Sequence, residues 1–172
     1  MLSSIKSRAA FAALASCLAV AGLTWAGDGS DGSKTTNGAQ PVSRQMENFA
    51  RNCQGCHGST GVSVKEVPPL ANRIGYFTRA EEGRAYLVQV PNVALSVLND
   101  KDLAEMLNWM LIRFGSDQLP ADFKPYTADE VGQLRKVRIT PTVRRAEVVK
   151  LLEDRQLVPS KDTLSLPLPG TY

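Results

Sequence analysis

Cys53, Cys56 and His57 lie within five consecutive residues, in the run Cys-Gln-Gly-Cys-His. Two thiols at this spacing can add to the two vinyl groups on one edge of a porphyrin, and the adjacent imidazole can bind its iron. The spacing is the known attachment signature of a haem held by thioether bonds. We therefore predict one covalent haem c, with Cys53 and Cys56 as its attachment residues and His57 as its iron ligand.

Other chemistries fit these residues less well. A structural zinc site needs four Cys or His ligands, and His57 is the only histidine in the chain. A thioredoxin-like pair of redox cysteines would be expected between strands and a helix, whereas the residues that flank Cys53 have a helical pattern. Dithiol redox chemistry remains the alternative to haem attachment.

The first 26 residues have the pattern of a secretory signal peptide. Lys6 and Arg8 precede an almost entirely apolar run over residues 9–26, and a polar stretch follows Ala26, where we expect cleavage. Two alternatives stay open: an uncleaved membrane anchor and lipidation at Cys17. Either of these would attach the protein to a membrane. Otherwise we expect an exported protein of the bacterial periplasm.

Composition and charge exclude one class of partner. The net charge is +3, and loss of Lys6 and Arg8 with the signal peptide would reduce it to +1, because 18 basic residues would then face 17 acidic ones. The chain has no basic stripe with interleaved aromatic residues, so nothing indicates nucleic-acid binding. The remaining chain is long enough for one compact domain around a large apolar cofactor.

The sequence after residue 42 predicts helices and no strands. Residues 27–42 are polar and rich in Gly and Ser, which predicts a flexible linker. Ser43 is a good helix N-cap, and apolar residues recur after it at the spacing of one helical face. These residues are Met46, Phe49, Ala50 and Cys53. The first helix should therefore lead directly into the haem motif.

A loop with Pro68 and Pro69 follows the motif. A proline carbonyl here could accept a hydrogen bond from the second ring nitrogen of His57, which would orient the iron ligand; a rigid turn with no such role is the alternative. Tyr76 and Phe77 are candidates to pack on the porphyrin. We expect Thr78 to cap a short helix over residues 79–88.

The clearest predicted helix spans residues 101–114, with Asn99 or Asp100 as its N-cap. The pattern of residues 116–157 predicts a helical extension. A capping box begins at Thr127, and a further helix should begin at Pro141. Residues 158–172 predict an extended tail. From residue 124 to 161 there are nine Lys or Arg and five acidic residues, which form either a docking face for an acidic partner or a solvated helical surface.

Residues 43–115 resemble the class I cytochrome c family. The matching features are Phe49 on the helix that enters the haem motif, the Pro68-Pro69-Leu70 turn, and Trp109 on the last helix. The resemblance implies an all-α fold, in which the first and last helices cross near Phe49 and Trp109 and surround one covalent haem. It says nothing about residues 116–172, so the helical C-terminal extension is an addition to the family pattern.

The sequence departs from the family at the second axial ligand of the iron. Members of this type usually offer a Met about ten residues before the last helix, but here Val90 precedes Pro91. Met106 or Met110 could bind the iron instead, although Met at helical spacing is usually core. A lysine or a tyrosine could also bind, or the position is vacant or holds water. We favour a vacant or weakly filled position.

The resemblance implies a periplasmic monohaem electron carrier and not an enzyme. It would pass single electrons from a dehydrogenase or a membrane quinol oxidoreductase to a terminal acceptor, so its partners would be a dehydrogenase, an oxidase or another cytochrome. One alternative is a five-coordinate haem protein that binds CO, NO or peroxide, without a second histidine as a base for peroxidase chemistry. The other is a haem-bearing subunit of a larger redox complex.

Overall fold

The computed structural model describes residues 42–64, 67–161 and 163–166. Over these residues the prediction of an all-helical protein is confirmed, since no strand is present among them. The predicted signal peptide with Cys17, nearly all of the predicted linker, and residues 162 and 167–172 of the tail lie outside the described residues. None of the described helices is both long and apolar enough to cross a membrane.

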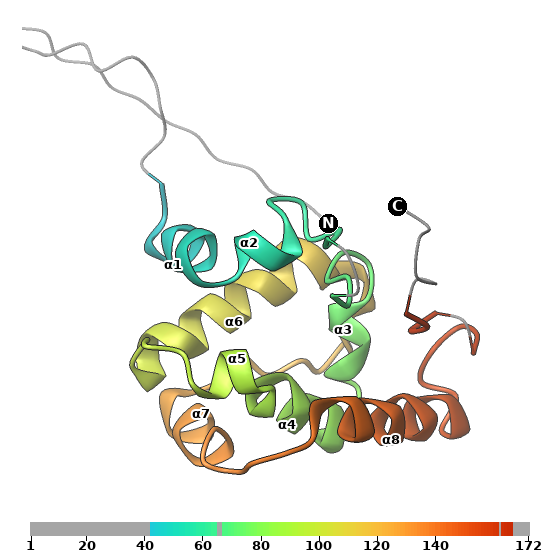
Figure 1. Cartoon of the computed structure of the whole chain (residues 1–172). Coiled ribbons are helices and arrows are strands. Elements are labelled where there is room, and N and C mark those ends of the chain that lie inside the picture. The colour runs from blue at the N-terminus through green and yellow to red at the C-terminus, as the bar shows by residue number, and fades with distance from the viewer. Residues whose placement is uncertain (1–41, 65–66, 162, 167–172) are drawn as a thin grey trace, which may run out of the picture. The chain divides into compact units, whose positions relative to one another are not determined.

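The helices follow one another in a single unit (Figure 1). They are α1 (Arg44–Asn52), α2 (Gln54–His57), α3 (Ile74–Phe77), α4 (Glu81–Gln89), α5 (Pro91–Ala94), α6 (Asp100–Gly115), the 3-10 turn η1 (Ser116–Gln118), α7 (Ala128–Leu134) and α8 (Pro141–Asp154). The longest of them, α6, packs against α1, α3 and α7 and is therefore the central helix of the unit.

The predicted contact between the first and last helices of the haem domain is confirmed. Ser43 caps α1 by accepting from the Met46 N–H, and Asn99 caps α6 by accepting from the Asp102 N–H. Phe49 is buried against α6, with its ring centroid 5.5 Å from that of Trp109 and 5.2 Å from that of Phe114. Such tilted aromatic pairs add to the free energy gained by burial.

Three local predictions were wrong. Met46 is 48% exposed, because only the Phe49 side of the short α1 contacts α6. Thr78 does not begin a helix: its hydroxyl donates to the Gly75 carbonyl at the end of α3, and α4 has Ala80 as its N-cap. Phe77, expected on the porphyrin, instead stacks on Tyr86 with centroids 5.6 Å apart.

Residues of the extension belong to both hydrophobic cores. The first core combines Phe49 and most of the buried face of α6 with Tyr126 and Val131. The second core joins haem-domain residues to residues of α8 and the tail, namely Phe77, Ala80, Tyr86, Val148, Leu152 and Leu164. Because these cores contain residues from both segments, the extension is part of the cytochrome-like body and not a separate attachment.

Two arginines, Arg145 on α8 and Arg84 on α4, bind groups of the protein itself. Arg145 is buried and donates to the Leu164 carbonyl at 2.8 Å, so the described part of the tail folds back on α8. Thr127 caps α7 as predicted, by accepting from the Glu130 N–H. The Glu130 carboxylate, however, does not complete the capping box by accepting from the Thr127 N–H. It instead accepts two hydrogen bonds from Arg84 on α4, at 2.5 and 2.8 Å. Arg145, one of the nine basic residues between 124 and 161, therefore has a structural role.

Candidate haem attachment site

The three motif residues lie on and next to one helical turn. α1 ends at Cys53, whose N–H still donates to the Phe49 carbonyl. Cys53 then starts α2, because its carbonyl accepts from the N–H groups of Cys56 and His57 at 3.2 and 3.0 Å. Gly58 ends α2 with φ +66, a left-handed conformation that glycine adopts without strain. The two thiols and the imidazole are therefore positioned by a single short turn.

The two cysteines are free thiols and form no disulfide. Cys56 is exposed, whereas Cys53 packs against the first core. Burial of Cys53, with the neighbouring Cys56 as a smaller cause, raises the pKa of the Cys53 thiol to about 11.

His57 is held through a serine. Its Nδ1 lies 3.1 Å from Ser63 Oγ, and the Ser63 hydroxyl donates to the Pro68 carbonyl at 2.9 Å. Since that hydroxyl proton goes to Pro68, Ser63 Oγ accepts from His57 Nδ1–H, and the Nε2 lone pair stays available for iron. Burial lowers the pKa of His57, and the Pro68 carbonyl partly offsets this shift.

The sequence analysis considered a proline carbonyl as the direct partner of His57, with a rigid turn as the alternative, and it missed Ser63. Ser63 is buried and has φ +73, which is uncommon for a residue other than glycine. Its own N–H donates to the His57 carbonyl at 3.0 Å, which closes the loop onto the motif. Nothing in the local spacing distinguishes Ser63 from Ser59, so only the folded loop reveals its role.

A connector of residues 90–99 separates α4 from α6 and contains the short α5. Its residues are Val, Pro, Asn, Ala, Leu and Ser, without a thioether, an imidazole or an amine. Figure 1 shows α2 and α5 on opposite sides of α6 in the view. The connector therefore supplies no side chain that binds iron strongly.

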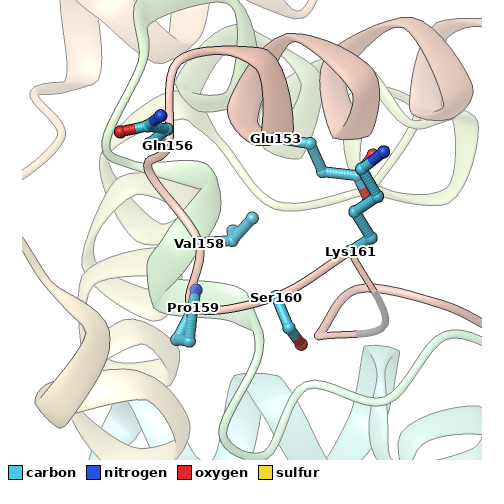
Figure 2. Close-up of a pocket in the computed structure, with 6 residues that line it drawn as sticks. All are labelled: Glu153, Gln156, Val158, Pro159, Ser160 and Lys161. Carbon is cyan, nitrogen blue, oxygen red and sulfur yellow. The ribbon is translucent and has the colours of Figure 1, made fainter.

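A surface pocket of about 360 Å³ lies elsewhere, at the end of α8 (Figure 2). It is lined by Glu153, Gln156, Val158, Pro159, Ser160 and Lys161. None of these residues belongs to the haem motif or to the connector, so the pocket is not part of the candidate site.

The donor set fits a covalent haem. Two unpaired thiols on one helical turn match thioether attachment, and the fixed tautomer of His57 leaves one ring nitrogen for iron. Within the part of the chain that the structure describes, no group of three His, Cys, Asp or Glu is placed to hold a metal ion. The two thiols and the available imidazole nitrogen are the groups that a covalently attached porphyrin requires.

Comparison with known proteins agrees with this geometry. No family model matches the chain. Two curated relatives named cytochrome c-552, one from Thermus thermophilus and one from a particular strain of the same species, are 31% identical over 118 residues. The match takes in 58% of this chain and 90% and 80% of the two relatives. This chain belongs to the class I c-type cytochromes.

As a c-type cytochrome, the protein is an electron carrier and its family implies haem c as the cofactor. The match covers 58% of this chain, which is more of the chain than residues 43–115 make up. The all-α fold expected for the family is confirmed. The assignments of Cys53, Cys56 and His57 as individual haem ligands stay predictions, which the geometry of α2 supports.

The second axial ligand of this cytochrome also stays a prediction. Val90 N-caps α5 and has no atom that could bind iron. Met106 and Met110, the two methionines considered as substitutes, are buried among the apolar side chains of the first core. Those contacts are the ordinary contacts of core methionines.

Proposed function

We propose that this cytochrome carries single electrons in the bacterial periplasm, from a dehydrogenase or a membrane quinol oxidoreductase to a terminal acceptor such as an oxidase or another cytochrome. The observation that carries the proposal is the single turn with Cys53, Cys56 and an imidazole oriented by Ser63. Haem c, when bound there, supplies a one-electron iron couple.

The chain's own residues do three things for this function. Cys53 and Cys56 hold the cofactor by two bonds, so it stays bound in both oxidation states. His57 binds the iron, and the hydrogen bond from its Nδ1 to Ser63 keeps the ring orientation constant. An electron carrier needs no bound substrate, and its docking to a partner requires only a small transient interface.

The proposed location rests on the N-terminal sequence pattern. Lys6, Arg8 and the apolar run that follows them indicate export, and we propose cleavage after Ala26. Mass spectrometry of the mature protein from its native host tests this directly. A mature chain that starts at residue 27 supports the proposal, whereas an intact N-terminus or a lipid on Cys17 would make the cytochrome membrane-anchored.

Electron exchange with host membranes tests the function itself. Ferric cytochrome is mixed with membranes of the native host and a quinol, and reduction is followed by the haem absorption bands. We expect reduction that needs the membranes and a redox titration that follows a one-electron Nernst curve. Purified dehydrogenases of the host serve as the second donor. A cytochrome that neither donor reduces would contradict the proposal.

One observation favours a second candidate function, the binding of a small ligand such as CO, NO or peroxide at the iron. Residues 90–99 supply no strong iron ligand, and Met106 and Met110 are buried in the first core, which favours an open sixth position. Electron transfer tolerates an open position, whereas ligand sensing requires one. Physiological ligand binding would be supported if CO or NO at micromolar concentration changed the rate of electron exchange with the host membranes.

A further inference from the structure

One arginine of the extension binds the backbone of the connector between α5 and α6. Arg135, at the C-cap of α7, donates from Nε to the Ala94 carbonyl at 2.9 Å and from Nη2 to the Ser96 carbonyl at 2.6 Å. Its Nη1 donates to the Leu98 carbonyl and to Asp100 Oδ1, both at 2.9 Å. The side chain is only 17% exposed. One guanidinium thus satisfies four acceptors along seven residues.

The hydrogen bonds from Arg135 add to the few contacts that residues 94–98 make within the connector. The N–H groups of Leu95 and Ser96 complete α5, and the Leu98 N–H binds the Ser96 hydroxyl. The side chains of Leu95 and Val97 are 64% and 91% exposed and contribute little packing. Val93 and Leu98 of the connector pack against the first core. Arg135 adds hydrogen bonds that hold the connector by its backbone carbonyls, which are present whatever the side chains are.

The helix that ends at Arg135, α7, is itself held in place by its packing. Val131 on α7 is fully buried in the first core, and the Glu130 carboxylate is paired with Arg84 on α4. Gly132 lies directly against Asp100: a Cβ at this position would come within 2.6 Å of Asp100 Oδ2. α7 therefore sits close against the start of α6, and the guanidinium is held at a constant position.

We propose that Arg135 is a positioning residue for the distal wall of the haem, which holds the connector in place and limits the access of outside ligands to the iron. The resemblance to the family implies a methionine that binds iron in this part of the chain. Here Val90 cannot do so, and the guanidinium instead holds the connector by its carbonyls. The inference rests on the proposed open sixth position. Lysine is a poor replacement, because one ammonium nitrogen has three donors and cannot span four separated acceptors.

The test compares Arg135→Ala and Arg135→Lys with the wild-type holoprotein. Arg138→Ala is the matched control, because Arg138 is exposed and makes no side-chain hydrogen bond among the described residues. Two quantities are measured: hydrogen exchange of the backbone amides of Leu95, Ser96 and Leu98, which are hydrogen-bonded within the connector, and the rate of CO rebinding to the ferrous protein after photolysis. Loss of several hydrogen bonds should speed amide exchange by about tenfold or more.

We expect faster exchange and faster CO binding in both Arg135 variants and wild-type values for Arg138→Ala. Asp100→Asn, which keeps the three carbonyl bonds, should lie between them, and it replaces Arg135→Ala if that variant does not fold. Unchanged exchange in the Arg135 variants would overturn the role of Arg135. If the wild-type ferrous protein binds no CO, the open position and the control of ligand access are both wrong, and the exchange data alone then decide whether Arg135 holds the connector.

Discussion

The side of the site that carries His57 and the side formed by the connector take their order from different parts of the chain. On the His57 side, every contact that orients the ligand lies within a short stretch of sequence, from Cys53 to Pro68 through Ser63. On the connector side, the fixed geometry depends on Arg135, which lies 35 to 41 residues away in sequence from the groups it binds.

The two sides therefore place different demands on residue type. The residues of the His57 side must be of particular types, because thioether bonds need thiols and the iron needs an imidazole nitrogen. The residues of the connector can be aliphatic, because Arg135 holds them by their carbonyls. Under the proposal for Arg135, such a connector would restrict access to the iron without itself binding the metal.

The largest expected effect removes the covalent chemistry of the His57 side. The double variant Cys53→Ala/Cys56→Ala should carry no haem that survives a denaturing gel, because no thiol remains in the motif. Haem staining of the gel and mass spectrometry measure this. Cys17→Ala is the control, and it should retain full haem content. Haem-free wild-type protein with two titratable thiols would instead support dithiol redox chemistry.

The next effect concerns how far the extension is part of the same folding unit. Leu152→Ala removes a fully buried side chain from the second core, and should lower the free energy of unfolding by about 2–5 kcal/mol. Denaturant unfolding should show a single transition by circular dichroism and by haem absorbance. Val143→Ala, at an exposed position of α8, should change stability by less than about 0.5 kcal/mol.

Two separate transitions in the Leu152→Ala experiment, with haem absorbance unaffected by the first, would show that the extension folds independently. In that case Arg135 would belong to a separate unit, and the contrast between a local side and a side supported by the extension would fail.

A smaller effect tests the local support of His57. Ser63→Ala removes the acceptor of the Nδ1 hydrogen bond, which makes the imidazole a weaker donor to the iron and should raise the midpoint potential. One hydrogen bond of about 1 kcal/mol corresponds to about 40 mV for one electron. Ser59→Ala, an exposed serine of the same loop, is the control. A potential equal to that of wild type would mean that His57 binds the Pro68 carbonyl directly.

The smallest expected effect concerns a polar contact that joins α1 to α6 away from the ligand. Arg44 is largely exposed, and it donates to Asp102 at 2.6 Å. Arg44→Ala should cost about 0.5–1 kcal/mol of stability, as exposed ion pairs usually do, and it should leave the midpoint potential unchanged. A shift of the potential in this variant would show that the His57 side is less local than the geometry indicates.

The parts that could be predicted from the sequence are those set by short-range patterns. The caps at Ser43, Asn99 and Thr127 and the pairing of Phe49 with Trp109 follow from spacing or from the resemblance to the family. Each of them depends on residues within one helix or on a family motif.

The parts that could not be predicted depend on tertiary contacts. The periodicity of α1 suggested a buried Met46, but only one side of this short helix meets a neighbour. Phe77 had an expected partner in the porphyrin, yet Tyr86 and the residues of α8 bury it. Arg135 is one of nine basic residues in a stretch that had the pattern of a solvated surface, and no local feature distinguishes it.

The most direct test of the account is an optical spectrum of the purified holoprotein, ferric and ferrous, with and without CO. The account predicts a covalently bound haem with a high-spin spectrum that shifts fully with CO, because the connector from Val90 to Asn99 supplies no sixth ligand. A low-spin spectrum that CO does not change would contradict it. In that case a side chain of the protein occupies the sixth position, and the two sides of the site are not as different as the structure indicates.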